Sequence, residues 1–275
     1  MSLPFADHCQ PLLDTPADVS DLLSFLRSRT ESRRWKYVEL RPLLPLDHAL
    51  GLKADLREGA SFCFHQLDLR PSTDELFRVF HKSCVQRKLQ RAGREGLVIE
   101  SGRSDSLLKN LYTLLLLTRR RHQLPPQPFV WFQNLTRGFG EDLVIWVASK
   151  DGQPVASILT LRYKKAVVYK YGCSDSRFHN LGGMPFLFWH AIQDAKAQGG
   201  EVFDFGRSEL ENSGLIAFKD HWGGSRSQLT YYRYARNSGA EGLQPFGMGL
   251  ARRVFSSLPD FCLTAAGRLL YRHIG

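Results

Sequence analysis

Three ionisable side chains in the second half of the sequence have the types and positions that acyl transfer to an amine requires. Forming an amide from an ester or thioester needs a deprotonated amine, a proton acceptor and a group that stabilises the tetrahedral oxyanion. Lys219 is the candidate for holding the oxyanion or a phosphate. Asp204 and Asp175, at the ends of predicted strands, are the candidates for orienting or deprotonating the amine. These three residues form the predicted catalytic set.

Each of these candidates also has a structural alternative. Lys219 could lay its aliphatic stem along Trp222 and keep its ammonium in water. Asp204 could cap the loop that follows its strand. Arg207, just past the same strand, either clamps a phosphate or pairs with one of the two glutamates that follow it. The sequence leaves these alternatives open.

Other reactive residue types give weaker signals. His221 is tempting as a base, but a single histidine in a loop of aromatic and glycine residues is more often structural. The sequence contains no Ser-His-Asp set, Walker A loop, GxGxxG after a strand or HExxH. The cysteines are dispersed without a CxxC spacing, which argues against a disulfide framework and a zinc site. We therefore predict no metal site. Each cysteine is interpreted as a small buried hydrophobic residue; the five are Cys9, Cys63, Cys84, Cys173 and Cys262.

The net charge of +10 and the isoelectric point near 9.5 favour anionic partners. A merely soluble basic protein is the alternative. On a helix expected to end at Arg94, the cations Arg87, Arg91 and Arg94 share one face, either as a phosphate-facing ridge or as a solvated surface. The 43% of hydrophobic residues is typical of a folded protein.

The sequence shows neither a transmembrane segment nor a signal peptide. The best apolar run, 111–118, is shorter than the roughly 18 residues that a span requires, and the first residues lack a charged region followed by an apolar one. We expect a cytoplasmic protein, with a peripheral association with the inner membrane as a further expectation.

The hydrophobic periodicity predicts alternating helices and strands. Helices are expected at 16–26, 72–94, 105–122, 129–135 and 183–198, and two more at 246–274, broken at Pro259. Strands are expected at 35–40, 61–67, 97–100, 143–148, 154–163, 166–171, 202–205 and 229–234. Asp151-Gly152 is a strong hairpin signal within a three-stranded antiparallel meander.

The element order from residue 105 onward resembles that of the GNAT superfamily. In this fold the strand after the meander and the strand after the next helix splay apart, here those ending at Tyr171 and Phe205. Unpaired backbone groups at the splay can hold a carbonyl oxygen and a pantetheine-like arm. The segment 177–183 does not match the coenzyme A-binding turn, although Gly182 and Gly183 could form an anion-binding turn or a plain helix cap.

Four runs, 169–175, 180–183, 203–208 and 214–224, resemble the Fem family of peptide-bond-forming transferases. They contain a Tyr-rich strand ending in small residues, an Asp-Phe-Gly strand, and a Phe-Lys followed by an aromatic-Gly-Gly. The similarity covers about 73–234. The sequence resembles the Fem-related proteins that accompany bacterial exopolysaccharide and sorting systems more than the enzymes that build cell-wall bridges.

The resemblance implies a transferase that joins an activated acyl group to an amine of a cell-envelope or exopolysaccharide precursor. The implied donor is an aminoacyl-tRNA or acyl-CoA, with no permanently bound cofactor, and the implied acceptor carries phosphates. Lys219 coincides with the lysine of the Phe-Lys motif. Tyr171 and Trp222 fall in the shared motifs and are assigned to substrate binding, together with Arg207 and the Gly182-Gly183 turn.

The expected fold is α+β, a GNAT-like mixed sheet flanked by helices. Residues 71–236 correspond to one complete GNAT-like domain and residues 1–70 to part of another, so this is either a short form or a chain whose start is missing. Residues 237–275 are expected to form helices that pack back on the first domain. The alternative functions are an acyl-CoA-dependent N-acyltransferase and a non-catalytic basic module that binds RNA or an anionic surface.

Overall fold

The computed structural model describes residues 5–13, 15–44, 56–235 and 259–271. The chain divides into two compact units. The first comprises Met1–Phe64, Arg207–Ile216 and Arg226–Phe246, and the second comprises His65–Gly206, Ala217–Ser225 and Gly247–Gly275. The chain therefore enters and leaves each unit more than once, and three strands and one helix cross these boundaries and contribute residues to both units.

The first unit contains one long helix and strands of unequal length. Its elements are α1 (Pro16–Ser32), β1 (Tyr37–Leu40), the first part of β2 (Arg57–Asp68) and β8 (Ser225–Ala235). Thr15 and Asp18 form a capping box that fixes the start of α1. Strand β1 pairs antiparallel with β8. The buried side chains of β2 and β8 make a small core of Phe62, Phe64, Leu229 and Tyr231.

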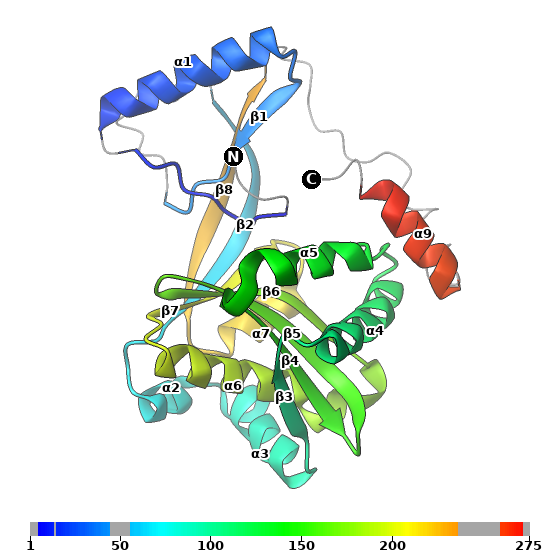
Figure 1. The fold of residues 1–275 in the computed structure, drawn as a ribbon. Helices are drawn as coiled ribbons and strands as arrows, with labels where there is room; N and C mark the ends of the chain where they lie inside the picture. The colour runs from blue at the N-terminus through cyan, green and yellow to red at the C-terminus, as the bar shows by residue number, and fades with distance from the viewer. Residues whose placement is uncertain (1–4, 14, 45–55, 236–258, 272–275) are drawn as a thin grey trace. The chain divides into compact units, whose positions relative to one another are not determined.

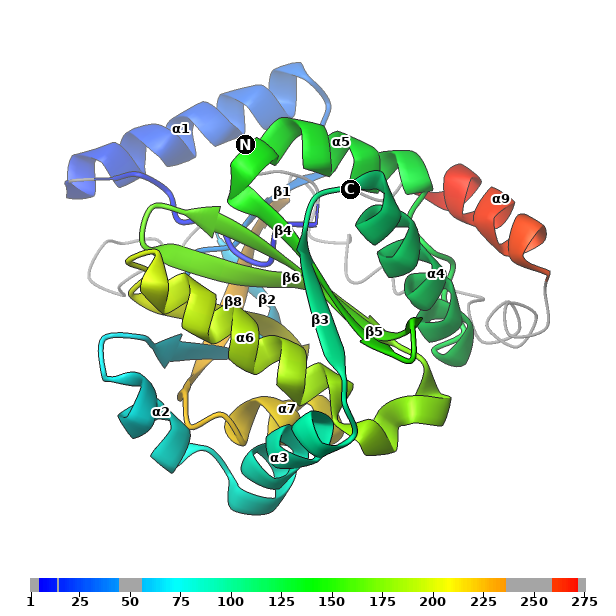
Figure 2. The same cartoon turned by 60° about the horizontal axis from the view of Figure 1, so that its bottom comes forward.

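The second unit is built on a mixed sheet with the strand order β7-β6-β5-β4-β3 (Figures 1 and 2). Neighbours among β3 to β6 are antiparallel, whereas β6 and β7 are parallel. The strands are β3 (Val98–Gly102), β4 (Leu143–Lys150), β5 (Gln153–Tyr163), β6 (Ala166–Ser174) and β7 (Val202–Glu209). The predicted meander is present, with its turn at Asp151-Gly152.

Helices cover both faces of this sheet (Figure 2). One face carries α4 (Asp105–Arg121) and α5 (Phe129–Phe139), and the other carries α6 (Gly183–Ala197), against which α3 (Arg87–Arg94) packs. In β4 the alternation is strict. Ile145 and Val147 join the core under α4 and α5, while Trp146 joins the core under α6. This period of two is what a strand buried on both faces requires.

A β-bulge changes the facing of β6 halfway along its length. Thr160 of β5 lies opposite Tyr169, but Leu159 lies opposite Tyr171, so Lys170 is an extra residue in β6. Because of this residue, Tyr169 packs in the core under α6, whereas Tyr171 packs in the core under α4 and α5.

The expected helix 72–94 is broken into three pieces, α2 (Thr73–Val79), the π-helix η3 (Lys82–Gln86) and α3. Phe80 is extended, and its ring packs edge-on against Trp222 and Trp189. The Gln86 side-chain amide donates to the carbonyls of Phe77 and Phe80, both at 2.9 Å. These bonds satisfy backbone groups that the break frees.

The region between β7 and β8, expected to be a loop, contains helix α7 (Ser213–Asp220). The Asn212 side chain accepts from the Leu215 backbone N–H at 3.1 Å and caps the first turn. Gly214 in that turn weakens the helical signal in the sequence. Lys219 therefore lies on a helix rather than in a loop.

The described part of the C-terminal region is α9 (Asp260–Leu270). Asp260 pairs with Arg120 of α4 at 2.6 Å, and Gly267 lies so close to the Pro126 carbonyl that an added Cβ would overlap it. These contacts are with the second unit, whereas we expected the C-terminal helices to pack on the first domain. The helix expected before Pro259 lies outside the described residues. Among the described helices, none is both long and apolar enough to cross a membrane.

Candidate active site

Strands β6 and β7 separate after a short parallel ladder. The ladder joins Ala166, Val167 and Val168 to Val202, Phe203 and Asp204, and the strands then run on to Ser174 and Glu209. The 3₁₀ turn η5 (Ser176–Leu181) and helix α6 follow β6 directly. This agrees with the splay expected from the sequence, and it leaves a helix N-terminus beside the end of β6.

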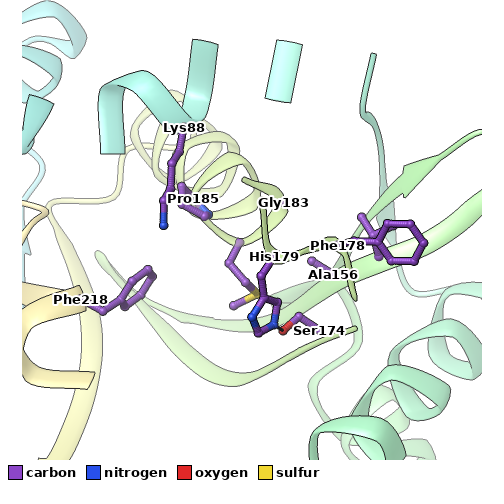
Figure 3. Close-up of a pocket in the computed structure, with 10 residues that line it drawn as sticks. Lys88, Ala156, Ser174, Phe178, His179, Gly183, Pro185 and Phe218 are labelled. Atoms are coloured by element: carbon purple, nitrogen blue, oxygen red, sulfur yellow. Dashed lines mark hydrogen bonds between the residues drawn. The ribbon is translucent and has the colours of Figure 1, made fainter. Parts of the chain in front are cut away.

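A pocket of about 210 Å³ lies at this N-terminus (Figure 3). It is lined by the end of β6, the turn η5, the start of α6, two residues of β5 and one residue each from α3 and α7. The lining residues are Lys88, Val155, Ala156, Ser174, Phe178, His179, Gly183, Met184, Pro185 and Phe218. The pocket is thus formed by the second unit alone.

The polar part of the pocket suits an anion or an acyl group. Lys88 is exposed and lines the pocket from α3, and the free N–H groups of a helix N-terminus attract negative charge. Ser174 Oγ lies 2.9 Å from His179 Nε2 on the opposite wall. Burial, reinforced by the charge of Arg121, lowers the pKa of His179, so this imidazole is neutral at physiological pH.

Lys219 and Asp204 both bind the backbone of Gly206 in β7. The Lys219 ammonium donates to the Gly206 carbonyl at 2.9 Å, and the Asp204 carboxylate accepts from the Gly206 N–H at 2.6 Å. Lys219 is only 2% exposed, so the alternative in which it reaches water is wrong. Asp204 lies within β7 rather than at a strand end, and its carboxylate binds Gly206 of the same strand instead of capping a following loop. Of the residues of α7, Phe218 lines the pocket, whereas Lys219 does not.

Asp175 caps the turn η5 and is bound by Arg177. Its carboxylate accepts from the Arg177 backbone N–H at 3.0 Å and from the guanidinium at 2.5 to 3.1 Å. These hydrogen bonds hold the pKa of Asp175 below its usual value against the opposing effect of burial. A carboxylate with a lowered pKa is a poor proton acceptor, so the geometry favours a structural role.

We expect Asp175→Asn to retain most of the transfer activity, whereas removal of a general base costs about 100-fold or more. The ion pair itself is tested with Arg177→Met. Because the folded-state pKa of Asp175 is lowered, the pair stabilises the protein above the unfolded pKa of about 3.9, and this stabilisation is lost as pH falls through the folded pKa. Urea unfolding at several pH values should show the deficit of the variant shrinking below about pH 4. A deficit that grows in acid would contradict the assignment.

Gly182 and Gly183 are required by close packing. Gly182 is the N-cap of α6 with φ of +80°, and an added Cβ would lie 2.6 Å from the Lys88 carbonyl oxygen. A Cβ on Gly183 would lie 3.1 Å from the Ala156 side chain. The pair therefore brings α6 onto α3 and β5. Gly183 also lines the pocket, as an anion-binding turn requires.

Gly182→Ala should destabilise the protein more than Gly199→Ala. Both glycines have a positive φ, which costs an alanine about 1–2 kcal/mol, but nothing lies within 4 Å of a Cβ added to Gly199. The overlap with the Lys88 carbonyl adds about 1–3 kcal/mol for Gly182. Equilibrium urea unfolding of both variants measures the difference. Equal losses of unfolding free energy in the two variants would show that α3 shifts to accommodate the added methyl group without an energetic penalty.

Two residues assigned to substrate binding lie elsewhere. The Tyr171 hydroxyl accepts from Trp131 Nε1 at 2.9 Å, on the face of the sheet covered by α4 and α5. Trp222 is completely buried and packs among Phe80, Phe188 and Phe205. Neither lines the described pocket. The bulge in β6 and the aromatic core explain these placements.

Arg207 belongs to the first unit, where it stacks on aromatic rings. Its guanidinium carbon lies 3.9 Å from the centre of the Phe62 ring, and Nη1 donates to the Tyr231 hydroxyl at 3.1 Å. Asp7 and Glu209 lie 3.8 and 3.9 Å from its guanidinium nitrogens. Pairing with Glu209 is therefore weak, and the half-buried guanidinium is held mainly by Phe62, Tyr231 and Asp7.

Sequence reasoning missed the residues that line the pocket. Lys88 lies among the cations of α3 but off the face that the spacing of Arg87, Arg91 and Arg94 marks. His179 falls in the turn compared with the coenzyme A motif, and Ser174 falls in the Tyr-rich run, so a signal existed for both. Phe218 was read only as part of a Phe-Lys pair.

Comparison with known proteins identifies the second unit. The family described as Acetyltransferase (GNAT) domain matches residues 81–220. Over 147 residues the chain is 24% identical to a UDP-N-acetylmuramoylpentapeptide-lysine N(6)-alanyltransferase of Weissella viridescens. The aligned region covers 50% of this chain and 42% of that enzyme, so the chain matches less than half of the relative's length.

Solved structures support the same fold. A crystal structure of FemX superposes with a TM-score of 0.69 at 14% identity, covering 91% of this chain and 85% of that one. The structure of L-PGS from Bacillus licheniformis superposes with a TM-score of 0.56 at 18% identity, covering 88% and 79%. The expected α+β fold with a mixed GNAT-like sheet is confirmed.

Proposed function

Because this chain belongs to the Acetyltransferase (GNAT) domain family and resembles the Fem transferases, we propose that it transfers an activated acyl or aminoacyl group to an amine of a cell-envelope or exopolysaccharide precursor. The amine nitrogen attacks the donor carbonyl carbon, and the C–O or C–S bond to the donor breaks. The proton lost by the amine leaves with the donor's hydroxyl or thiol group.

The observation that carries this proposal is the pocket at the splay of β6 and β7. It combines three features that acyl transfer uses: a gap between strands, a helix N-terminus and the exposed cation Lys88. Backbone groups near the gap can bind a carbonyl oxygen as negative charge develops on it. Lys88 and the N-terminus of α6 can bind the phosphates of either an aminoacyl-tRNA or acyl-CoA. No metal or redox group enters this reaction scheme.

The donor is identified by offering the two candidate donors in separate reactions. Purified full-length protein is incubated with alanyl-tRNA or with acetyl-CoA, and with UDP-N-acetylmuramoyl pentapeptide as the lysine-containing acceptor that the Weissella relative's name specifies. We expect mass spectrometry to show one alanyl residue added from alanyl-tRNA. Acetyl addition alone would identify an acyl-CoA-dependent enzyme, and transfer from neither donor to any envelope amine would contradict the proposal.

Lys88 provides a test of the donor site. Lys88→Ala should raise KM for the donor by about 10-fold while changing kcat little, since a phosphate contact binds substrate and transition state alike. Lys82→Ala is the matched control, because Lys82 is also exposed but does not line the pocket. Equal effects of the two variants would show general electrostatic attraction rather than a specific contact.

The exposed cations of α3 are also compatible with the alternative function of a non-catalytic RNA-binding module, which experiment can test. Arg87 and Arg94 are exposed, and Arg91 pairs with Glu95 at 3.5 Å. A non-catalytic basic module would bind RNA with a steep dependence on salt concentration and would transfer no acyl group. RNA binding without transfer from any charged tRNA or acyl-CoA would favour that function over ours.

A further inference from the structure

Three side chains that commonly bind metals meet on the second unit, outside the pocket. They are His81, between α2 and η3, Cys84 in η3, and His221, directly after α7. One ligand atom of each lies within 4.8 Å of those of the other two. Their spacing in the sequence gives no metal motif, because only the fold brings His221 to the other two.

The backbone holds this cluster together. The His81 N–H donates to the His221 carbonyl at 2.9 Å, and the two imidazole rings lie with their centres 4.5 Å apart. His81 Nδ1 also accepts from the Cys84 N–H at 3.2 Å, which caps η3. The π-helical turn places Cys84 beside the two rings, and such turns are frequent at functional sites.

We propose that His81, Cys84 and His221 bind a zinc ion. Two imidazoles and one thiolate are ligands that zinc prefers, at about 2.0–2.1 Å for nitrogen and about 2.3 Å for sulfur. These bond lengths place tetrahedral ligand atoms about 3.5 Å apart, so binding requires side-chain rotations that bring the three atoms closer than their present separation of up to 4.8 Å. A zinc ion bound to His81 Nδ1 would displace the contacts of this atom with the Cys84 N–H at 3.2 Å and with Ser83 Oγ at 3.3 Å.

The surroundings permit a cation and leave one coordination position open. His81 is exposed, and Cys84 and His221 are half-buried, so the ion and a fourth, water ligand can enter from solvent. The negative charge of Asp220 and the positive charge of Lys88 have opposite electrostatic effects on His221. Zinc binding converts the Cys84 thiol to a thiolate and releases its proton to the buffer.

Binding would tie the break between α2 and α3 to the end of α7. His221 follows Lys219 by two positions, so the ion would fix the C-terminal turn of the helix that carries the proposed catalytic lysine. A folded-state ligand stabilises the protein in proportion to its excess over Kd. The inference is independent of the proposed acyl transfer, because it concerns metal binding by the chain itself.

The test is zinc binding by the metal-free full-length protein, measured by competition of ZnCl₂ with a chromophoric chelator. We expect one ion per chain, a rise in Tm on binding, and at least a 10-fold loss of affinity in Cys84→Ser and His221→Ala. Cys262→Ser and His190→Ala are matched controls that should bind as the unaltered chain does. Zinc binding that Cys84→Ser leaves unchanged, or no binding at equimolar zinc, would overturn the proposal.

Cobalt supplies a second readout that does not depend on stability. Co²⁺ in the same site should give a thiolate-to-metal charge-transfer band in the near ultraviolet that is absent in Cys84→Ser and present in Cys262→Ser. His81→Gln provides a variant at an exposed position that should fold normally, and it should weaken binding to a similar degree. A cobalt spectrum without a Cys84-dependent band would exclude this site.

Discussion

Replacing Lys219 with alanine is expected to lower kcat for acyl transfer by about 100- to 1000-fold, the loss typical when a group stabilising an oxyanion is removed. Lys219 is nearly fully buried, and its ammonium donates to the carbonyl of Gly206 on the strand that borders the splay. Such an ammonium acts strongly on charge that develops nearby, because little water screens it. The steady-state rate with the preferred donor measures the effect.

A purely structural lysine would also reduce activity, so the comparison needs further variants. Lys219→Met keeps most of the side-chain volume but removes the charge and the hydrogen bond to Gly206. If Lys219 acts by its charge, both variants lose kcat, and small alkylammonium ions restore part of it in Lys219→Ala, where the substitution leaves a cavity. If the lysine only holds β7 to α7, the loss of activity follows the loss in unfolding free energy and added amines restore none.

Unchanged kcat in Lys219→Ala would remove the catalytic assignment altogether. In that case the pocket residues Lys88, Ser174 and His179 would be the candidates that remain, because they line the space itself. The contact of Phe218 with the pocket links Lys219 to it through one residue of α7.

The sequence predicted the strands well because their burial is periodic. Strand β4 alternates between the two cores of the second unit, and the Asp151-Gly152 turn sets its register with β5. A strict period of two would put Tyr169 and Tyr171 on the same face of β6, but the two rings lie in different cores. The extra residue Lys170 reverses which side of the sheet the following side chains of β6 face. No residue type in this strand signals a bulge.

Helix breaks and long-range contacts were equally hidden. Phe80 leaves the helical conformation because its ring packs with Trp222 and Trp189, which are distant in sequence. The pairing of His81 with His221 depends on the same break. Hydrophobic periodicity indicates which face of a helix or strand is buried, but it does not indicate which distant residues pack against that face. The sequence therefore predicted the position of the candidate site from its strand ends, but it did not predict which residues line the pocket.

Trp222 shows how a motif residue is assigned wrongly when only its type is known. An aromatic residue followed by two glycines was assigned to substrate binding, but Trp222 has no exposed surface. Its ring centre lies 5.0 Å from that of Phe80 and 5.6 Å from that of Phe188. Its indole N–H has no hydrogen-bond partner among the described residues. The residue thus joins α2, α6 and β7 in one core.

Trp222→Ala should lower the free energy of unfolding by about 3–5 kcal/mol, the usual cost of emptying a buried aromatic site. Trp222→Phe should cost clearly less, because it keeps much of the ring contact and removes a buried donor whose desolvation costs about 1–3 kcal/mol. Trp35→Ala is the control, since Trp35 is 40% exposed. Equilibrium urea unfolding ranks the three variants. If Trp222→Phe instead keeps full stability but raises KM several-fold, the indole contacts substrate and the core assignment is wrong.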